Sequence, residues 1–215
     1  MTSREFKDRL TRRARKARVE LPTDVFAPFE AYFRLLAQWN VKINLTGLPL
    51  QPPTDETFDR LFIEPLVAST LVAESPGVWF DLGSGGGSPA LPLKMIRSTL
   101  SLTLVESKIR KAAFLREVVR VLGLTGTEVA NIRFEELQTK VDGTADLITV
   151  RAVRPDTALF DVSARLLKSG GHLLLFGKPS PRLKHPGFEP DTSRTEVSSS
   201  IVMGYKRMFH VEQTD

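Results

Sequence analysis

The sequence predicts an α/β protein with three layers, α/β/α, built on a seven-stranded mixed sheet and preceded by a helical extension. Three observations predict this fold class. Apolar strand-like runs alternate with helical periodicity through the middle of the chain, which is typical of helices packed on both faces of a mostly parallel sheet. A glycine-rich turn at residues 83–87 directly follows the first run. The second run ends in a carboxylate, Glu106.

The N-terminal part reads as a series of helices. Residues 1–21 are predicted to form a polar, frayed helix that stops at Pro22. A second helix, 25–39, carries apolar side chains at helical spacing and can be capped by Thr23 or Asp24. The proline-rich stretch 48–53 reads as a loop, and a third helix is expected over 55–74.

The remaining chain supplies the sheet and the helices that cover it. The almost wholly apolar run 145–150 reads as a central parallel strand. The last two short strands are expected to pair antiparallel at one end of the sheet, after a loop-like stretch rich in Pro, Ser and Thr. The expected strands are 78–82, 100–106, 128–132, 145–150, 173–176, 201–203 and 208–211, and the expected helices are 90–96, 108–122 and 156–167.

Composition limits the classes of protein to consider. A chain of 215 residues fits one medium domain, which we expect at 75–215, after a helical extension at 1–74. There is no cysteine, and the three histidines are scattered, so neither a disulfide nor a metal site is expected. No apolar run approaches the ~18 residues of a membrane span, and no apolar leader begins the sequence. We therefore expect a cytoplasmic protein without a membrane partner; a monomer is our working expectation, although the sequence carries no signal for the oligomeric state.

The positive charge is concentrated at the N-terminus. Residues 1–20 hold eight basic and three acidic side chains, so they carry the whole net charge of +5. Such an arm suits the phosphate backbone of a nucleic acid, whose attraction is electrostatic. A solvated helix face explains the same pattern equally well, and the sequence leaves both interpretations open.

The glycine-rich turn and the acid after the second strand together indicate a nucleoside site. Glycines at 83, 85 and 87 permit close approach of backbone to a ligand. Asp81 precedes them, which favours a loop for S-adenosylmethionine (AdoMet) over a dinucleotide fingerprint, since that fingerprint would place glycine where Ser88 stands. Glu106 lies 19 positions after Gly87, close to the ~20 expected for an acid that accepts from ribose hydroxyls. A cap for the helix that starts near Lys108 is the alternative role of Glu106.

Three segments resemble one known family. Residues 39–46 (WNVKINLT), 81–89 (DLGSGGGSP) and 111–118 (KAAFLREV) are similar in order and spacing to segments of the bacterial glucose-inhibited division protein B family (RsmG). The segments 133–136 and 150–152 resemble two later family segments, so the likeness spans about residues 25–178. Leu61, Glu64, Pro65 and Ser88 depart from the family pattern.

The resemblance implies the class I methyltransferase fold, AdoMet as cofactor, and methylation of a guanine N7 in 16S ribosomal RNA, with that RNA or the small ribosomal subunit as partner. It implies no catalytic acid or base; Arg151, Arg133 and Asn44 are candidates for positioning the reactants. The candidates for cofactor binding are Asp81, Gly83, Gly85, Gly87, Ser88, Glu106, Ser107, Phe134, Glu135 and Arg151. The candidates for substrate binding are Asn40, Asn44, Arg116, Arg133 and Lys178.

Several alternatives stay open. Phe134 can be an ordinary core aromatic, Asn44 a structural turn residue, and Arg151 one half of an ion pair. The acceptor can be another RNA, a protein or a small molecule. A nicotinamide-dependent oxidoreductase and an RNA-binding module without catalysis are the readings from other classes, and the G-x-G-x-G turn argues against the first of them.

Overall fold

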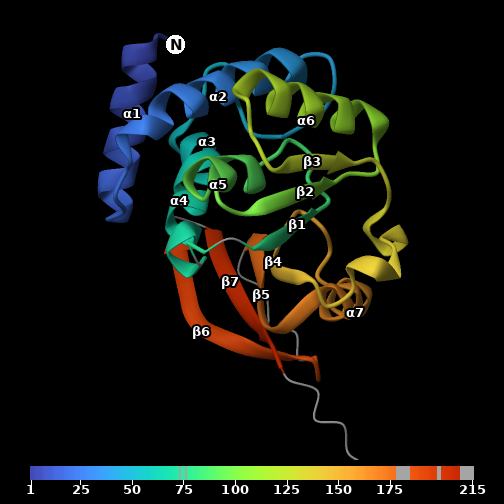
Figure 1. Cartoon of the computed structure of the whole chain (residues 1–215). Helices are drawn as coiled ribbons and strands as arrows, with labels where there is room; N and C mark the ends of the chain where they lie inside the picture. Colours follow the sequence, from blue (N-terminus) through green and yellow to red (C-terminus); the bar gives the residue numbers. More distant parts are fainter. Residues whose placement is uncertain (73, 76, 178–184, 198–199, 209–215) are drawn as a thin grey trace, which may run out of the picture.

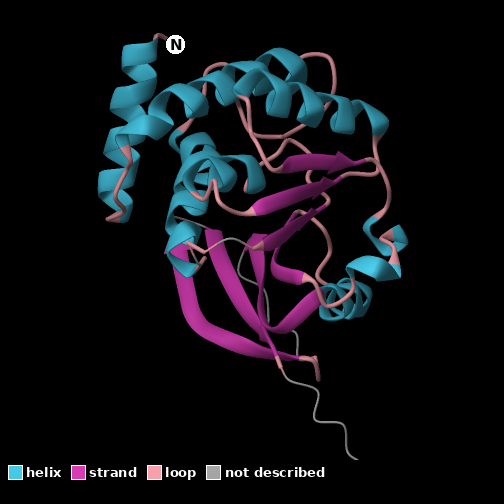
Figure 2. Ribbon diagram, in the orientation of Figure 1, coloured by secondary structure: helices cyan, strands magenta, loops and turns pink. Residues whose placement is uncertain are grey.

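A computed structural model describes residues 1–72, 74–75, 77–177, 185–197 and 200–208. Its centre is a seven-stranded sheet with the order β3-β2-β1-β4-β5-β7-β6. Helices lie on both sides of this sheet (Figures 1 and 2). The predicted fold class, a three-layer α/β protein with a mixed sheet, is therefore confirmed.

Five parallel strands bring the ends of β1, β2 and β4 to one edge. β1 (Val78–Leu82) pairs with β2 (Ser101–Val105) on one side and β4 (Ala145–Arg151) on the other. β3 (Thr127–Ala130) lies outside β2, and β5 (Leu167–Gly177) lies outside β4. Since Leu82 is in register with both Val105 and Val150, the residues that follow these strands meet at the carboxyl edge of the sheet.

The antiparallel pair at the far end differs in position from the prediction. β6 (Phe188–Val197) and β7 (Ser200–Arg207) pair antiparallel, and β7 pairs antiparallel with β5. An antiparallel pair does end the sheet, but its two strands are not the pair predicted at 201–203 and 208–211, because β6 occupies a stretch that was expected to be a loop. Ladder pairing with β7 overrides the weak strand propensity of its Pro, Ser and Thr residues. Of the strand predicted at 208–211, residues 209–211 lie outside the described residues.

Two apolar cores separate the sheet from its helices. Trp79 of β1 belongs to the core shared with α2 (Phe26–Asn40), α5 (Ala90–Ile96) and α6 (Ile109–Leu122). Its neighbour Phe80 belongs to the opposite core, shared with α7 (Thr157–Leu166). The alternation follows from the period of two in a strand, which sends successive side chains to opposite faces.

The prediction of a frayed N-terminal helix is wrong, because this helix is capped and packs against the rest of the protein. α1 (Ser3–Ala17) begins with a capping box between Thr2 and Glu5, and its Phe6 and Leu10 are buried. The prediction missed these apolar residues because basic side chains dominate residues 1–20. Three of its arginines, Arg9, Arg12 and Arg13, form ion pairs with Asp55, and Arg13 also pairs with Asp59. α2 (Phe26–Asn40) follows the 3₁₀ turn η1 (Thr23–Val25).

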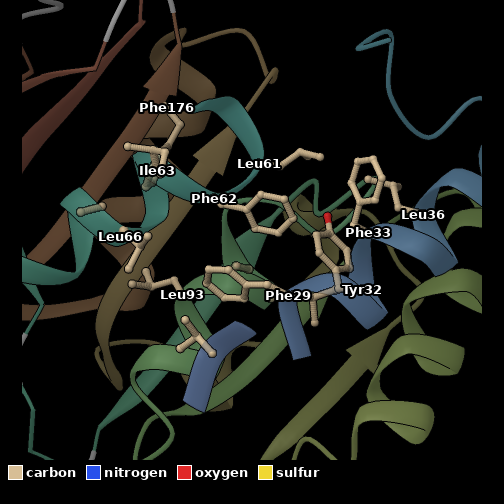
Figure 3. Packing of buried hydrophobic residues seen from close by; sticks show 14 of the residues in the cluster. Phe29, Tyr32, Phe33, Leu36, Leu61, Phe62, Ile63, Leu66, Leu93 and Phe176 are labelled. Carbon is tan, nitrogen blue, oxygen red and sulfur yellow. The ribbon is translucent and has the colours of Figure 1, made fainter. Parts of the chain in front are cut away.

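The third predicted helix is divided into four short elements of different pitch. α3 (Asp55–Phe58) leads into the π-helix η2 (Asp59–Ile63), which is followed by α4 (Glu64–Ala68) and the 3₁₀ turn η3 (Ser69–Leu71). Figure 3 shows Phe62 of this segment beside Phe29 and Tyr32 of α2, and Ile63 beside Phe176 of β5. Residues from both sides of the predicted division at 74/75 share this core, and the division itself stays a prediction.

Two further 3₁₀ turns, η4 (Phe134–Glu136) and η5 (Thr139–Val141), connect β3 to β4. Among the helices that the structure describes, none combines the length and the apolar character needed to cross a membrane. The described residues also contain no group of three or more His, Asp or Glu side chains arranged to hold a metal ion.

Candidate active site

The glycine-rich turn joins β1 to α5 at the carboxyl edge of the sheet. Gly83, Gly85 and Gly87 have φ angles of 76°, 53° and 89°, in the left-handed region that disfavours a side chain. A Cβ would lie 2.6 Å from Val153 Cγ2 at position 83 and 2.3 Å from Leu91 Cδ1 at position 87. The turn needs glycine for its backbone path and for the space around it.

Glu106 lies across from this turn and is hydrogen-bonded to it. Its carboxylate accepts from the Gly85 amide at 2.9 Å and from the Lys108 amide at 2.8 Å, and the residue is only 6% exposed. The contact with Lys108 fulfils the helix-capping alternative, because Lys108 is the N-cap of α6. The contact with Gly85 also brings the acid to the glycine turn. Glu106 therefore caps the helix and lies beside the turn at the same time. Each carboxylate oxygen keeps about one lone pair for a further donor.

Asp81 is buried beneath the turn. Thr149 donates from its hydroxyl to the Asp81 carboxylate at 2.5 Å, and the Trp79 indole donates to Thr149 at 2.9 Å. Burial raises the pKa of Asp81 to about 6, against the opposing effects of the bonds from Thr149 and Ser84 and of the Arg151 charge. The side chain is therefore poised to gain or lose a proton near neutral pH.

A cavity of about 450 Å³ opens in front of the turn, within the size range of small-molecule sites. Its wall is formed by the end of α2, the loop after it, the π-helix, the glycine turn and the starts of the segments after β2 and β4. The described residues that line it are Leu36, Asn44, Leu45, Thr46, Gly47, Leu48, Arg60, Leu61, Gly83, Ser84, Gly85, Gly86, Ser88, Glu106, Lys111, Arg151 and Ala152.

A larger cavity, about 900 Å³, lies between α1, α2 and residues 50–53. It contains none of the predicted site residues and mixes three acidic with three arginine side chains along its wall. We place the active site at the smaller cavity, because the glycine turn, Glu106 and Arg151 converge there.

Arg151 stands at the end of β4, in the wall of this cavity. Its guanidinium pairs with Glu64 and donates to the Arg60 carbonyl and to the Ser88 hydroxyl. Its Nε is buried without a hydrogen-bond partner among the described residues. The ion-pair alternative for Arg151 thus coexists with a place in the wall of the cavity.

The other predicted residues divide into those near the cavity and those away from it. Asn44 is exposed in the cavity wall. Asn40 holds the loop closed, since its side chain accepts from the Leu45 and Thr46 amides and donates to the Thr46 carbonyl. Ser107, Arg116, Arg133 and Glu135 are exposed and do not line the cavity.

Phe134, in η4, packs against the core shared with α7, as its core-aromatic alternative describes. Lys178 lies outside the described residues.

Arg60 and Lys111 line the cavity although neither was a predicted site residue, and two further contributors were also not predicted. Tyr32 of α2 donates from its hydroxyl to the Gly86 carbonyl at 2.6 Å, which ties the helical extension to the glycine turn. Ala152, next to Arg151, has a φ of 59° in the left-handed region, a strained conformation that often marks functional sites. The aromatic periodicity of α2 pointed only to a core role there, and the family-like segment 150–152 contains Ala152 without indicating its backbone conformation.

The chain matches the sequence model of the GidB family, described as rRNA small subunit methyltransferase G, over residues 26–184. Similar proteins named ribosomal RNA small subunit methyltransferase G occur in Xanthomonas campestris pv. campestris (strain B100) and Xylella fastidiosa (strain 9a5c). The first is 37% identical over 166 residues, 75% of this chain and 73% of the relative. The second is 39% identical over 158 residues, 73% of this chain and 70% of the relative.

A crystal structure of a SAM-dependent methyltransferase from Aquifex aeolicus shares the fold, with a TM-score of 0.55 and 18% identity. That likeness covers 69% of this chain and 91% of the other.

Proposed function

This chain belongs to the GidB family, that of rRNA small subunit methyltransferase G, and we propose that it transfers the methyl group of AdoMet to N7 of a guanine in 16S ribosomal RNA. It is an AdoMet-dependent methyltransferase by family and by fold. We propose three further properties: guanine N7 is the target atom, the protein is a monomer, and it acts in the cytoplasm on the small ribosomal subunit.

The observation that carries the proposal is the contact between the Glu106 carboxylate and the Gly85 amide at the wall of the cavity. It places an acid with unused lone pairs beside a turn whose backbone is accessible. Gly83, Gly85 and Gly87 would accommodate the methionine part of AdoMet, Asp81 would lie near its amino group, and Glu106 would accept from the ribose hydroxyls. Of these residues, Gly83, Gly85 and Glu106 line the cavity and fit the cofactor, as does Arg151, whereas Asp81 and Gly87 are buried and outside its lining.

When bound, AdoMet supplies an electrophilic methyl group on a positively charged sulfur. Guanine N7 carries a lone pair and no proton, so its methylation requires no general base. Among the described residues that line the cavity there is no histidine, and Glu106 is the one carboxylate. The task of the protein is to hold the two reactants in line, which can account for about 7–11 kcal/mol of the barrier.

The base must leave the RNA fold before a cavity can take it. Arg60, Lys111 and Arg151 present cationic groups along the wall, and a guanidinium can donate to guanine O6 while N7 stays free. Asn44 offers an amide in the same wall. We propose that the exposed Arg116 and Arg133 contact phosphates outside the cavity, together with Lys178.

The test is incubation of the purified chain with labelled AdoMet and ribosomal RNA from cells that lack its gene. Free 16S RNA and assembled small subunits are tested separately. We expect label in 16S RNA at a guanine N7, located by the backbone cleavage to which N7-methylguanosine is prone, and far less label with Glu106→Gln. Label at another atom, or in a protein or small molecule, would refute the proposal in favour of another class I acceptor.

A further inference from the structure

The segment between α3 and α4 lacks one backbone donor beside the cavity, because its residue 65 is proline. The Glu64 amide donates to the Asp59 carbonyl, five residues back, as in a π-helix. The next residue is Pro65, which has no N–H. It cannot donate to the Arg60 carbonyl at the π spacing or to the Leu61 carbonyl at the α spacing. Both carbonyls can therefore accept from other parts of the chain.

Donors at the cavity fill these positions. The Ser88 hydroxyl lies 3.2 Å from the Arg60 carbonyl and 3.2 Å from the Leu61 carbonyl. Arg151 donates from Nη1 to the Arg60 carbonyl and, at 3.0 Å, to Ser88 Oγ. From Nη2 it donates to the Glu64 carboxylate. The helical segment thus occupies two of the five N–H donors of the guanidinium, and Ser88 occupies a third.

The ion pair is buried and its support is rigid. The side chain of Glu64 is 0% exposed and that of Arg151 is 12% exposed. The guanidinium also lies over the Phe176 ring, 5.1 Å from its centroid. Phe62, two residues before Glu64, stacks on Phe29 with ring centroids 4.9 Å apart (Figure 3). Such packing leaves the turn little freedom to follow a moving side chain.

We propose that Glu64 and Pro65 are positioning residues for methyl transfer. Pro65 keeps the Arg60 and Leu61 carbonyls open, and these carbonyls, with Ser88 and the Glu64 carboxylate, hold the Arg151 guanidinium in one orientation at the cavity wall. The guanidinium is then already ordered at the wall of the cavity, without a cost of ordering at the moment of reaction. This inference rests on the proposed function.

The discriminating variant is Pro65→Ala. It adds a backbone N–H that can donate to the Arg60 carbonyl in competition with Arg151. We expect kcat to fall about tenfold, within the ~100-fold that misplacement of a reacting group can cause, with a smaller change in KM. The melting temperature should stay the same or rise, since the helix gains a hydrogen bond. A merely structural proline predicts the reverse, a lower melting temperature with unchanged kcat. Pro28→Ala, in the first turn of α2, is the matched control.

A second readout does not depend on activity. The Nε–H resonance of Arg151, identified by its loss in Arg151→Lys, should be sharp in the wild type and in Pro28→Ala, and shifted or broadened in Pro65→Ala. If Pro65→Ala does not fold, Glu64→Gln is measured instead, with the same expectation for kcat and for the resonance.

A wild-type protein without transfer to 16S RNA refutes the proposed function, while the resonance still tests the positioning. Wild-type kcat and an unmoved resonance in the variant overturn the positioning.

Discussion

Replacement of Glu106 by glutamine tests the contact that defines the active site. The carboxylate accepts from the Gly85 and Lys108 amides, one on each oxygen. About one lone pair per oxygen then remains, which matches the two hydroxyls of a ribose. In Glu106→Gln one oxygen becomes an NH₂ group, which cannot accept and would face one of the two amide donors. The variant keeps the size of the side chain and loses one complete set of acceptor positions.

The expected loss is set by one hydrogen bond to a charged group. Such a bond contributes about 1.5–3 kcal/mol, so the Kd for AdoMet should rise about 10- to 150-fold. Calorimetric titration with AdoMet measures this directly. Glu117→Gln is the matched control, because it makes the same chemical change on α6 at a side chain paired with Arg120 and outside the cavity. If Glu106→Gln binds AdoMet as tightly as the control does, the assignment of the ribose position to Glu106 is wrong.

Three further changes test the surroundings of the turn. Tyr32→Phe removes the hydrogen bond to the Gly86 carbonyl. It should lower the free energy of unfolding by about 1 kcal/mol, measured by denaturant unfolding, and weaken AdoMet binding, measured by titration. Unchanged values would show that α2 does not hold the turn. Gly86→Ala brings a Cβ to 3.1 Å from the Leu45 carbonyl and should cost about 1–3 kcal/mol, whereas wild-type stability would mean that the loop yields freely. Burial raises the pKa of Asp81 to about 6, so the folded state binds this proton more tightly than the unfolded chain, and the contribution of Asp81 to stability is lost as pH rises from about 4 through about 6. Relative to Asp81→Asn, the free energy of unfolding of the wild type should therefore fall by about 1–3 kcal/mol between pH 4 and pH 8. AdoMet should bind the wild type more weakly below pH 6, because its amino group favours the ionised carboxyl. A difference between the two proteins that does not depend on pH would contradict the raised pKa.

The local sequence pattern was sufficient to predict the five parallel strands of the sheet, but not the strand at its antiparallel edge. The apolar run 145–150 predicted β4 because a strand buried on both faces needs an unbroken apolar sequence. β6 lacks that pattern, and its backbone is ordered by pairing with β7. The same difference applies to α1, where only packing against the aromatic residues of α2 and the π-helix distinguishes Phe6 and Leu10 from a frayed, charged segment.

The sequence by itself determined the fold class, the glycine turn and the acid at the end of β2. These depend on short-range spacing, on the conformations that glycine permits, and on the rule that parallel strands share a carboxyl edge. Only the tertiary structure decided which side chains surround the cavity and how they are oriented. The Tyr32 hydroxyl meets a carbonyl 54 residues away, and the Arg151 guanidinium meets one 91 residues away. Such contacts depend on how α2 and the π-helix pack against the sheet, and no local pattern carries that information.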